Sequence, residues 1–193
     1  YAVGIDIGGT NTRVALINES YEIIERIQFL TDVDDPDKTM DKIVETISSF
    51  KLDIVGVGMS CPGPLDLIKG KILTTPNLHG KWHDCEISKK LEEKIHIPVY
   101  LENDANLAAL AESIIGEGKA YDYVQYLTVS TGLGAGLVIN KKIFIGAHGF
   151  ANEVANCCMK HEGPSHGMIY PGGIEAISSG TGIIEQAKKR GLK

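Results

Sequence analysis

Hydrophobic residues at the start of the chain follow the spacing of β-strands. Residues Ala2–Ile7 form an apolar run that ends at Gly8-Gly9, and Thr12–Ile17 alternates between apolar and polar positions. A turn at Asn18-Glu-Ser20 leads into a further run, Ile23–Phe29. Short apolar runs bounded by Gly and Asn are typical of strands. The start of the chain therefore predicts an antiparallel meander.

The spacing then changes to that of helices separated by strands. After Asp35-Pro36, the apolar residues Met40, Ile43, Val44 and Ile47 fall on one face of a helix, and Pro is favoured in a first helical turn. Downstream the pattern predicts a strand at Ile54–Met59, a loop at Cys61–Pro64 and irregular chain over 65–85 with a short strand near Ile72. It then predicts a helix at Ile87–Ile95 that must end before Pro98, a strand at Val99–Glu102 and a helix from Asp104 to Ile115.

A second group of strands follows. The pattern predicts strands at Val124–Val129 and Ala135–Ile139, a turn at Asn140-Lys141 leading into Ile143–Ile145, a loop over 146–172, and helices at Gly173–Ile177 and Ile183–Arg190. The order of all these elements predicts an α/β fold in which a mixed sheet is flanked by helices. Because Gly116-Glu-Gly118 ends a helix, we expect two lobes, residues 1–115 and 116–193. The sequence stops within a helical pattern, so we expect the second lobe to be truncated.

Composition and charge narrow the class of protein. The chain has 193 residues, is 43% hydrophobic and carries a net charge of −6, which suits a globular protein but disfavours direct binding to nucleic acid. The longest apolar runs have the length of strands, so we expect no membrane span. Four cysteines without a framework spacing, and no visible leader, predict a reducing, cytoplasmic setting.

The first motif that could carry chemistry is Asp6-Ile-Gly-Gly-Thr10. A strand delivers a carboxylate to its end, and two glycines then let the backbone approach a ligand closely. Such a loop can hold a phosphate on its N–H groups, with Asp6 reaching Mg²⁺ directly or through water. An ordinary Gly-Gly hairpin capped by Asp and Thr is the competing interpretation.

The second motif is Leu101-Glu-Asn-Asp-Ala-Asn106, where a strand leads into a helix. Strand ends of this kind often line ligand sites. Asn103 offers donors and an acceptor, and Asp104 could take a proton from a hydroxyl that attacks a phosphoryl group. Asp and Asn are also common helix caps, so a purely structural role stays open.

The third motif is the turn Ser130-Thr-Gly-Leu-Gly-Ala-Gly136 between two predicted strands. It fails the dinucleotide pattern G-x-G-x-x-G because the third glycine comes one residue early and a strand, not a helix, follows. The chain contains no Walker A sequence either. The turn instead mirrors the first motif, and two such hairpins could grip a polyphosphate from both sides. A plain β-hairpin is the alternative.

Cysteines and histidines gather later in the chain, at Cys157-Cys158, His161 and His166. Zinc sites usually carry the spacing C-x₂₋₄-C, which the adjacent cysteines lack, so a metal site is disfavoured. Glu175 lies on the following predicted helix, where it could bind polyhydroxyl groups or be an ordinary solvated residue.

Together these motifs resemble the ROK family, which contains repressors, uncharacterised reading frames and sugar kinases. The resemblance runs in order along essentially the whole chain. It comprises Asp6–Thr10 as the D-I-G-G-T phosphate loop, Cys61-Pro-Gly63, Thr75-Pro-Asn-Leu78 with Trp82, Asn103-Asp104 as the N-D-A-N motif, Thr131-Gly-Leu-Gly134 as the second phosphate loop, Gly146 with Glu153, and Gly172–Ala176.

The sequence departs from the family at one segment. The family usually has G-E-x-G-H, but here Glu153 is followed by Asn156 at the position of the His. That His normally binds both sugar and zinc. The cysteines of the family's zinc segment are also missing between His166 and Gly173. We therefore expect no structural zinc, and the identity of the sugar is open.

The resemblance implies an actin-like (ribonuclease H-like) fold of two lobes, the second incomplete, in an ATP-dependent hexose kinase that forms a homodimer. Asp104 would be the general base for attack by the sugar, at its 6-hydroxyl. The residues implied in sugar binding are Gly63, Asn77, Asn103, Asp104, Glu153, Asn156 and Glu175. Those implied in binding ATP and Mg²⁺ are Asp6, Gly8, Gly9, Thr10, Asn11, Thr131, Gly132 and Gly134, with Asp6 nearest the metal.

A sugar-sensing domain of a ROK-type transcriptional regulator is the main alternative. Such a protein needs a DNA-binding module, and this sequence opens directly on its first predicted strand. A regulator also has no need of an intact phosphate loop or of Asp104. A different actin-like ATPase, or an acetate-kinase-type enzyme, is a weaker alternative because Asn103-Asp104 and the pair Glu153 and Glu175 match the sugar kinases.

Overall fold

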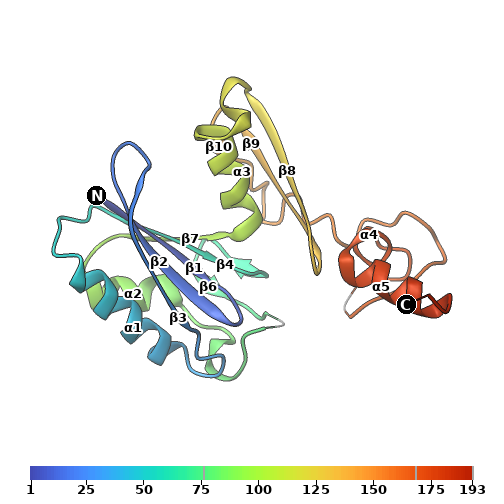
Figure 1. Cartoon of the computed structure of the whole chain (residues 1–193), viewed down its shortest axis with the longest axis horizontal. Coiled ribbons are helices and arrows are strands. Elements are labelled where there is room, and N and C mark those ends of the chain that lie inside the picture. The colour runs from blue at the N-terminus through green and yellow to red at the C-terminus, as the bar shows by residue number, and fades with distance from the viewer. Residues whose placement is uncertain (76, 168, 193) are drawn as a thin grey trace. The chain divides into compact units, whose positions relative to one another are not determined.

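The structure is a computed structural model that describes residues 1–75, 77–167 and 169–192. The chain divides into two compact units, Tyr1–Asp104 (the N-terminal unit) and Ala105–Lys193 (the C-terminal unit). The boundary lies at the start of a helix, whereas the sequence predicted it at the end of that helix, after Ile115. Figure 1 shows the elements of both units.

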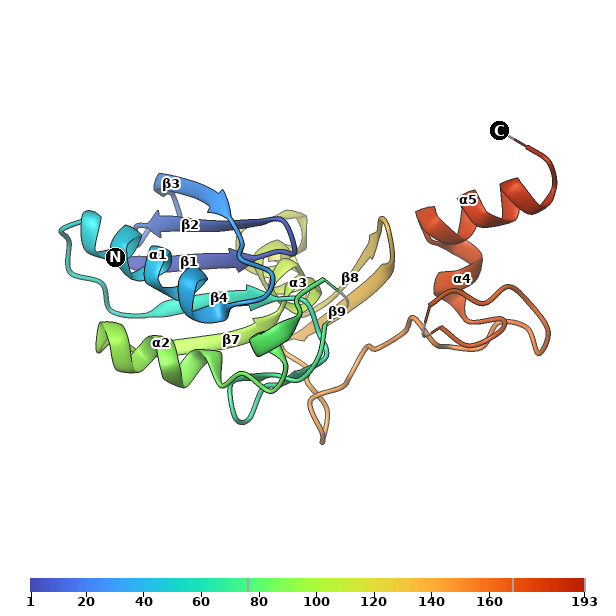
Figure 2. The same cartoon turned by 90° about the horizontal axis from the view of Figure 1, so that it is seen from below.

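A five-stranded mixed sheet forms the centre of the N-terminal unit, in the order β3-β2-β1-β4-β7 (Figure 2). The predicted meander is confirmed, because β1 pairs antiparallel with β2, and β2 with β3. Strand β4 pairs in parallel with both β1 and β7. The strands span Ala2–Ile7 (β1), Asn11–Ile17 (β2), Ile23–Leu30 (β3), Val57–Cys61 (β4) and Val99–Asn103 (β7).

Two helices cover one face of this sheet, α1 (Pro36–Ser49) and α2 (Ile87–Ile95) (Figure 2). Helix α1 begins where the sequence predicted, because the Asp35 carboxylate accepts a hydrogen bond from the Asp37 N–H and Pro36 occupies the first turn. Its apolar stripe, with Met40 and Ile43 fully buried, packs on the strands. Burial of such side chains contributes about 1.5–3 kcal/mol each.

The chain between β4 and α2 is held by a few specific contacts. It contains the short strands β5 (Leu65–Asp66) and β6 (Lys71–Ile72) and a 3₁₀ turn, η1 (Gly80–Trp82). Trp82 is fully buried, and its Nε1 donates to the Asp32 carbonyl oxygen at 2.8 Å. This segment is thereby fastened to the loop that precedes α1.

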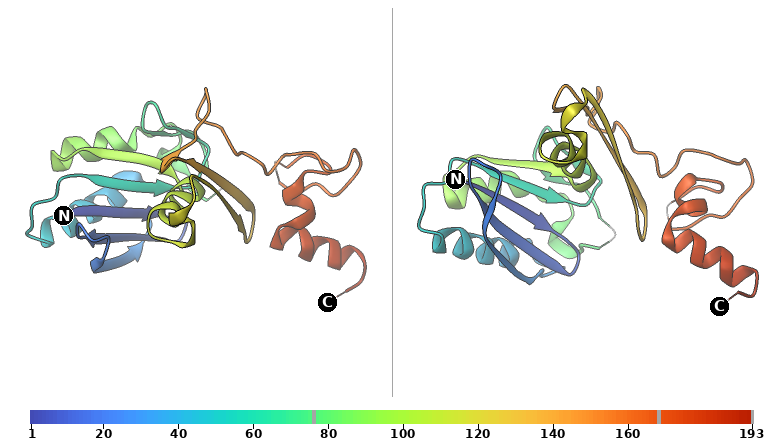
Figure 3. Two further views of the ribbon diagram at one scale, coloured as in Figure 1. Left: turned by 90° about the horizontal axis from the view of Figure 1, so that it is seen from above. Right: turned by 45° about the horizontal axis from the view of Figure 1, so that its top comes forward.

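The C-terminal unit is built from a helix and a hairpin. Helix α3 spans Asp104–Ile114, and the antiparallel strands β8 (Tyr123–Val129) and β9 (Leu133–Ile139) follow a 3₁₀ turn, η2 (Glu117–Ala120), that the sequence did not predict (Figure 3). Asn140 and Lys141 both have positive φ, as a tight hairpin turn requires, and lead into β10 (Lys142–Ile143). Lys141 Nζ donates to the carbonyl oxygens of Ser113 and Tyr121 and so fastens the turn to the end of α3.

The last part of the C-terminal unit contains long irregular segments and two helices. Helices α4 (Ile174–Ser178) and α5 (Gly180–Lys189) follow one another directly. Ser179 lies between them and caps α5, its Oγ accepting a hydrogen bond from the Gly182 N–H at 3.0 Å. Among the residues that the structure describes, no helix is both long enough and apolar enough to cross a membrane.

Candidate active site

Asp6 lies at the end of β1, where neighbouring strands fix both of its carboxylate oxygens. Oδ2 accepts a hydrogen bond from Arg13 Nη1 at 2.7 Å, and Oδ1 accepts one from Ser60 Oγ at 2.8 Å. Arg13 and Ser60 stand beside Asp6 in the register of β2 and β4. About half of the Asp6 side chain is exposed. The carboxylate is therefore oriented by the sheet and open to a ligand.

The loop Gly8–Asn11, called the first loop below, turns tightly between β1 and β2. Its backbone closes through the Gly8 N–H, which donates to the Asn11 carbonyl oxygen at 3.0 Å. Thr31, directly after β3, holds this loop through two hydrogen bonds. The Thr31 N–H donates to the Thr10 carbonyl oxygen at 3.0 Å, and Thr31 Oγ1 donates to the Gly8 carbonyl oxygen at 2.8 Å.

Two of the predicted ligand loops meet in the N-terminal unit. A Cβ on Gly9 would lie only 2.5 Å from the Cβ of Asn77, so the two backbones approach as closely as a glycine allows. Asn77 is in turn positioned by its neighbours, since the Leu78 N–H donates to Thr75 Oγ1 at 3.1 Å. The structure therefore brings Asn77 next to the first loop.

Asp104 is exposed, directly after β7 and at the start of α3. Because β1, β4 and β7 run parallel, their carboxyl ends share one edge of the sheet, the edge at which ligands usually bind in such folds. Cys61 is the last residue of β4, which lies between the strand that carries Asp6 and the strand that precedes Asp104. The pKa of its thiol is raised to about 12, chiefly by burial and then by the negative charges of Asp104 and Asp6. The thiol therefore stays neutral at physiological pH, which disfavours it as a nucleophile.

The same edge carries the other predicted ligands of this unit. Asn103 pairs with Cys61 in the ladder of β4 and β7. Its Nδ2 would lie 3.6 Å from a Cβ on Gly63, in the loop after β4. Gly63, Asn103 and Asp104 thus lie at the same edge of the sheet, and their role as sugar ligands stays a prediction.

In the C-terminal unit, Glu175 lies against the turn Thr131–Gly134, called the second loop below. The Leu133 N–H donates to Glu175 Oε2 at 2.8 Å. Two backbone hydrogen bonds join the start of α5 to the β8–β9 turn, from the Gly180 N–H to the Ser130 carbonyl oxygen and from the Thr181 N–H to the Thr131 carbonyl oxygen. The sequence predicted Glu175 as a sugar ligand and did not foresee this contact.

Glu153 and Asn156 lie in the irregular chain before α4, and both are exposed. The Asn156 Oδ1 accepts a hydrogen bond from the Tyr170 N–H at 2.9 Å, across the loop in which the family's zinc segment would lie. No group of three or more His, Cys, Asp or Glu among the described residues could hold a metal ion. Met168, which lies in the stretch that aligns with the family's zinc segment, is outside the described residues.

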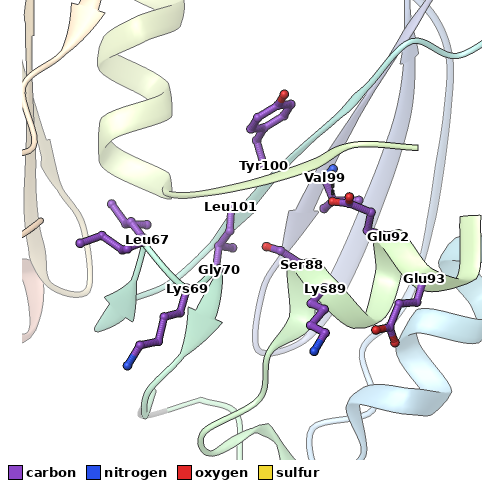
Figure 4. A pocket seen from close by; sticks show the side chains of 11 residues that line it. Leu67, Lys69, Gly70, Ser88, Lys89, Glu92, Glu93, Val99, Tyr100 and Leu101 are labelled. Carbon is purple, nitrogen blue, oxygen red and sulfur yellow. Dashed lines mark hydrogen bonds between the residues drawn. The ribbon is translucent and has the colours of Figure 1, made fainter. Parts of the chain in front are cut away.

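The N-terminal unit also has a hollow of about 540 Å³ between the β5–β6 hairpin, α2 and β7 (Figure 4). Its lining includes Lys69, Lys89, Glu92 and Glu93, whose charges balance, and none of the predicted site residues. A hollow whose charges balance, and whose lining also includes Leu67, Val99 and Leu101, does not suit a polyphosphate. We therefore place the candidate site at the strand ends.

Three residues of this arrangement were missed in the sequence, namely Arg13, Ser60 and Thr31. Each donates a hydrogen bond to a residue of the first motif, from a neighbouring strand or from the residue directly after one. Their signal was weak, because alternation along a strand shows which face a side chain occupies but not which residue stands opposite.

Residues 2–193 match the ROK family. A glucokinase from Halalkalibacterium halodurans is 32% identical over 96% of this chain and 58% of that enzyme. A xylose repressor from Bacillus subtilis is 31% identical over 100% of this chain and 51% of the repressor. A solved ROK family glucokinase from Streptomyces griseus, in complex with glucose and AMPPNP, matches with a TM-score of 0.80 and 30% identity over 98% of this chain and 60% of that one.

The chain spans about half to three fifths of the length of these relatives. The likeness in structure confirms the predicted fold class, an actin-like α/β fold. The match over nearly every residue also confirms the family suggested by the motifs. Glucokinases and xylose repressors both match nearly the whole chain, at about the same identity. The chain therefore belongs to the ROK family.

Proposed function

We propose that the protein containing this chain transfers the terminal phosphoryl group of ATP to a hexose, at its 6-hydroxyl, with Asp104 as general base. The observation that carries the proposal is the edge of the sheet at which the parallel strands end, where Asp6 is the next-to-last residue of β1 and Asp104 directly follows β7. A regulator needs neither a phosphate loop nor a base beside it. The glucokinase relatives support the same reaction class.

In the N-terminal unit, the proposed sugar ligands are Gly63, Asn77, Asn103 and Asp104. Asp104 accepts the proton of the attacking sugar hydroxyl. The oxygen of that hydroxyl bonds to the γ-phosphorus of ATP, and ADP leaves. Because Asp104 is exposed and directly follows β7, a substrate hydroxyl can reach its carboxylate from solvent. The first loop, Gly8–Asn11, would hold the phosphates through N–H groups other than that of Gly8, which donates to the Asn11 carbonyl oxygen.

In the C-terminal unit, we assign Glu153, Asn156 and Glu175 to the sugar and Thr131, Gly132 and Gly134 to the nucleotide phosphates. Support comes from the contact of Glu175 with the second loop and from the solved relative in complex with glucose and AMPPNP. Thr131 is exposed at the tip of the β8–β9 turn, where its hydroxyl can reach a ligand.

Asp6 is the residue whose chemistry suits Mg²⁺. The ion prefers carboxylate and water oxygens, and it neutralises the charge that develops on transferring phosphate oxygens. Arg13 and Ser60 occupy one acceptor direction on each oxygen of the Asp6 carboxylate. A carboxylate has about four such directions, so Asp6 can still accept the ion or one of its waters.

We also propose that the protein uses no structural zinc. The amide of Asn156 takes the place of a potential zinc ligand and instead holds the Tyr170 N–H. That hydrogen bond closes the loop on which a zinc ion would otherwise act.

The second candidate function is a sugar sensor in a ROK-type regulator. The observation that favours it is the xylose repressor relative, which is nearly as similar to this chain as the glucokinase is. Such a protein would bind a sugar and transmit the signal to a DNA-binding module, without turnover of ATP.

Phosphorylation assays with the protein as its gene encodes it would decide between these functions. The assay combines Mg²⁺, ATP and a panel of hexoses and N-acetylhexosamines. We expect turnover with at least one sugar and a loss of about 10²–10⁴-fold in kcat for Asp104→Asn, because a general base contributes that much. The affinity for the sugar should change little, since the amide retains hydrogen-bonding groups.

Asp53→Asn is the matched control, because it removes an exposed carboxylate of the same unit that lies before β4, near the amino ends of the strands, and not at their carboxyl ends. It should leave kcat unchanged. Full activity of Asp104→Asn would rule out the proposed base, and sugar binding without turnover across the panel would favour the sensor.

A further inference from the structure

The contact between Glu175 and the second loop connects a proposed sugar ligand with a loop that is proposed to bind nucleotide phosphates. Glu175 Oε2 lies 2.8 Å from the Leu133 nitrogen and accepts its hydrogen. A hydrogen bond from a backbone N–H to a charged carboxylate is among the stronger hydrogen bonds in proteins. One carboxylate oxygen of a proposed sugar ligand is therefore committed to a proposed phosphate loop.

Gly132 is what allows the carboxylate to come so close. A Cβ at this position would lie 2.8 Å from Glu175 Oε2 and 3.3 Å from its Cδ. Any residue larger than glycine would push the carboxylate away from the Leu133 N–H. The contact with Glu175 therefore requires glycine at position 132, whether or not the second loop binds phosphate.

The backbone of α4 fixes Glu175 from the other side. Its N–H donates to the Ala155 carbonyl oxygen at 3.1 Å, and the neighbouring Ile174 N–H donates to the Cys157 carbonyl oxygen at 3.0 Å. These bonds connect Glu175 to the chain on either side of Asn156, another proposed sugar ligand. A continuous path therefore runs from this segment through Glu175 to the second loop.

We propose that Glu175 is a positioning residue for the second loop, which it holds in the shape that binds nucleotide phosphates. This inference rests on the proposed function. The Ser130 N–H closes the loop from one end by donating to the Gly132 carbonyl oxygen at 2.9 Å, and Glu175 ties down the next residue, Leu133. Ordering a loop before the ligand arrives raises affinity, because the entropy of ordering is no longer lost on binding.

The test measures nucleotide affinity with no sugar present, so that a role limited to sugar contact would not register. Calorimetry with Mg²⁺ and AMPPNP compares the wild type with Glu175→Ala and Glu175→Gln. We expect the Kd to rise roughly tenfold or more in Glu175→Ala, because the Leu133 N–H then has no side-chain acceptor to hold it. Glu175→Gln should stay within about threefold of the wild type, since its amide oxygen can accept the same N–H.

Glu185→Ala is the matched control. Glu185 lies on α5 of the same unit and contacts His166 rather than the loop, so its loss changes the net charge equally and should leave the Kd unchanged. An unchanged Kd in Glu175→Ala would overturn the proposal. Tighter binding in that variant would also overturn it, because the carboxylate would then be competing with phosphate.

Hydrogen exchange at the Leu133 amide separates this inference from the proposed function. We expect exchange to be faster in Glu175→Ala and close to wild type in Glu175→Gln. Equal exchange in all variants would overturn the positioning role even if ATP binds. If the wild type binds no nucleotide, the proposed function fails and the nucleotide part of this proposal fails with it, while exchange still decides whether Glu175 holds the loop.

Discussion

At the scale of single residues, Thr31 shows how a buried hydroxyl can shape a ligand loop from behind. Its Oγ1 donates to the Gly8 carbonyl oxygen and lies 2.9 Å from Thr12 Oγ1. Thr12 is fully buried and Thr31 is only 8% exposed, so water cannot easily replace these bonds. Thr31→Val keeps the shape of the side chain and removes the hydroxyl.

We expect Thr31→Val to lower the free energy of unfolding by about 1–3 kcal/mol, because buried polar groups lose their partner. It should also weaken binding of Mg²⁺ and AMPPNP, since the first loop is then less well held. Urea denaturation and calorimetry measure the two effects. Thr31→Ser retains the hydroxyl and should restore the nucleotide affinity. Wild-type affinity in Thr31→Val would contradict a positioning role for this residue.

At the scale of elements, Gly136 sets how closely α3 lies on β9. A Cβ at this position would lie 2.5 Å from the Ala105 carbonyl oxygen and 2.9 Å from the Ala109 Cβ. It would also lie 2.8 Å from the Asn106 Cα, so two of the three nearest atoms are backbone and cannot move aside cheaply. We expect Gly136→Ala to reduce the free energy of unfolding by about 1–3 kcal/mol, the usual cost of overpacking, as measured by urea denaturation.

Gly58 in β4 is the matched control for that substitution. It is also a strand glycine, but a Cβ there would meet no atom within 4 Å. Gly58→Ala should therefore change the free energy of unfolding by no more than about 0.5 kcal/mol, as is usual for exposed sites. If both variants were equally stable, the close packing of α3 on β9 would not be what requires glycine at position 136.

The elements that could be predicted from sequence are those with local signals. Helix α2 has the predicted bounds, and α1 begins at its predicted cap, because periodicity and capping residues lie within each helix. The start of β4 was predicted wrongly. The apolar run begins at Ile54, but the paired ladder begins where Val57 meets Val3, and Val55 is 76% exposed. Pairing depends on a distant strand, so the run alone could not show it.

At the scale of the whole molecule, motif order along the chain was sufficient to identify the family, but not how each unit holds its loops. Helix α5 illustrates the limit. It begins at Gly180 rather than at the predicted Ile183, because Ser179 caps it while two glycines at its start weaken the helical signal. The homodimer implied by the family stays a prediction.

Acid should destabilise the protein, because several of its carboxylates are paired with lysines. Hydrogen bonds from Lys38, Lys81 and Lys71 lower the pKa of Asp32, Asp35 and Asp84, respectively, below their usual value. A carboxyl group whose pKa is lowered on folding stabilises the protein above its unfolded pKa, about 3.9, and loses that contribution as the pH falls through the folded value. We therefore expect the melting temperature to decrease as the pH falls below about 4.

Asp35→Asn tests this expectation. The variant keeps an oxygen for the cap of α1 but removes the charge that pairs with Lys81, so it should lower the melting temperature at pH 7 and flatten its decline in acid. Asp53→Asn, which removes a carboxylate for which the described residues show no ion pair, should do neither. Equal acid slopes in the wild type and in Asp35→Asn would show that this pair contributes nothing to the decline.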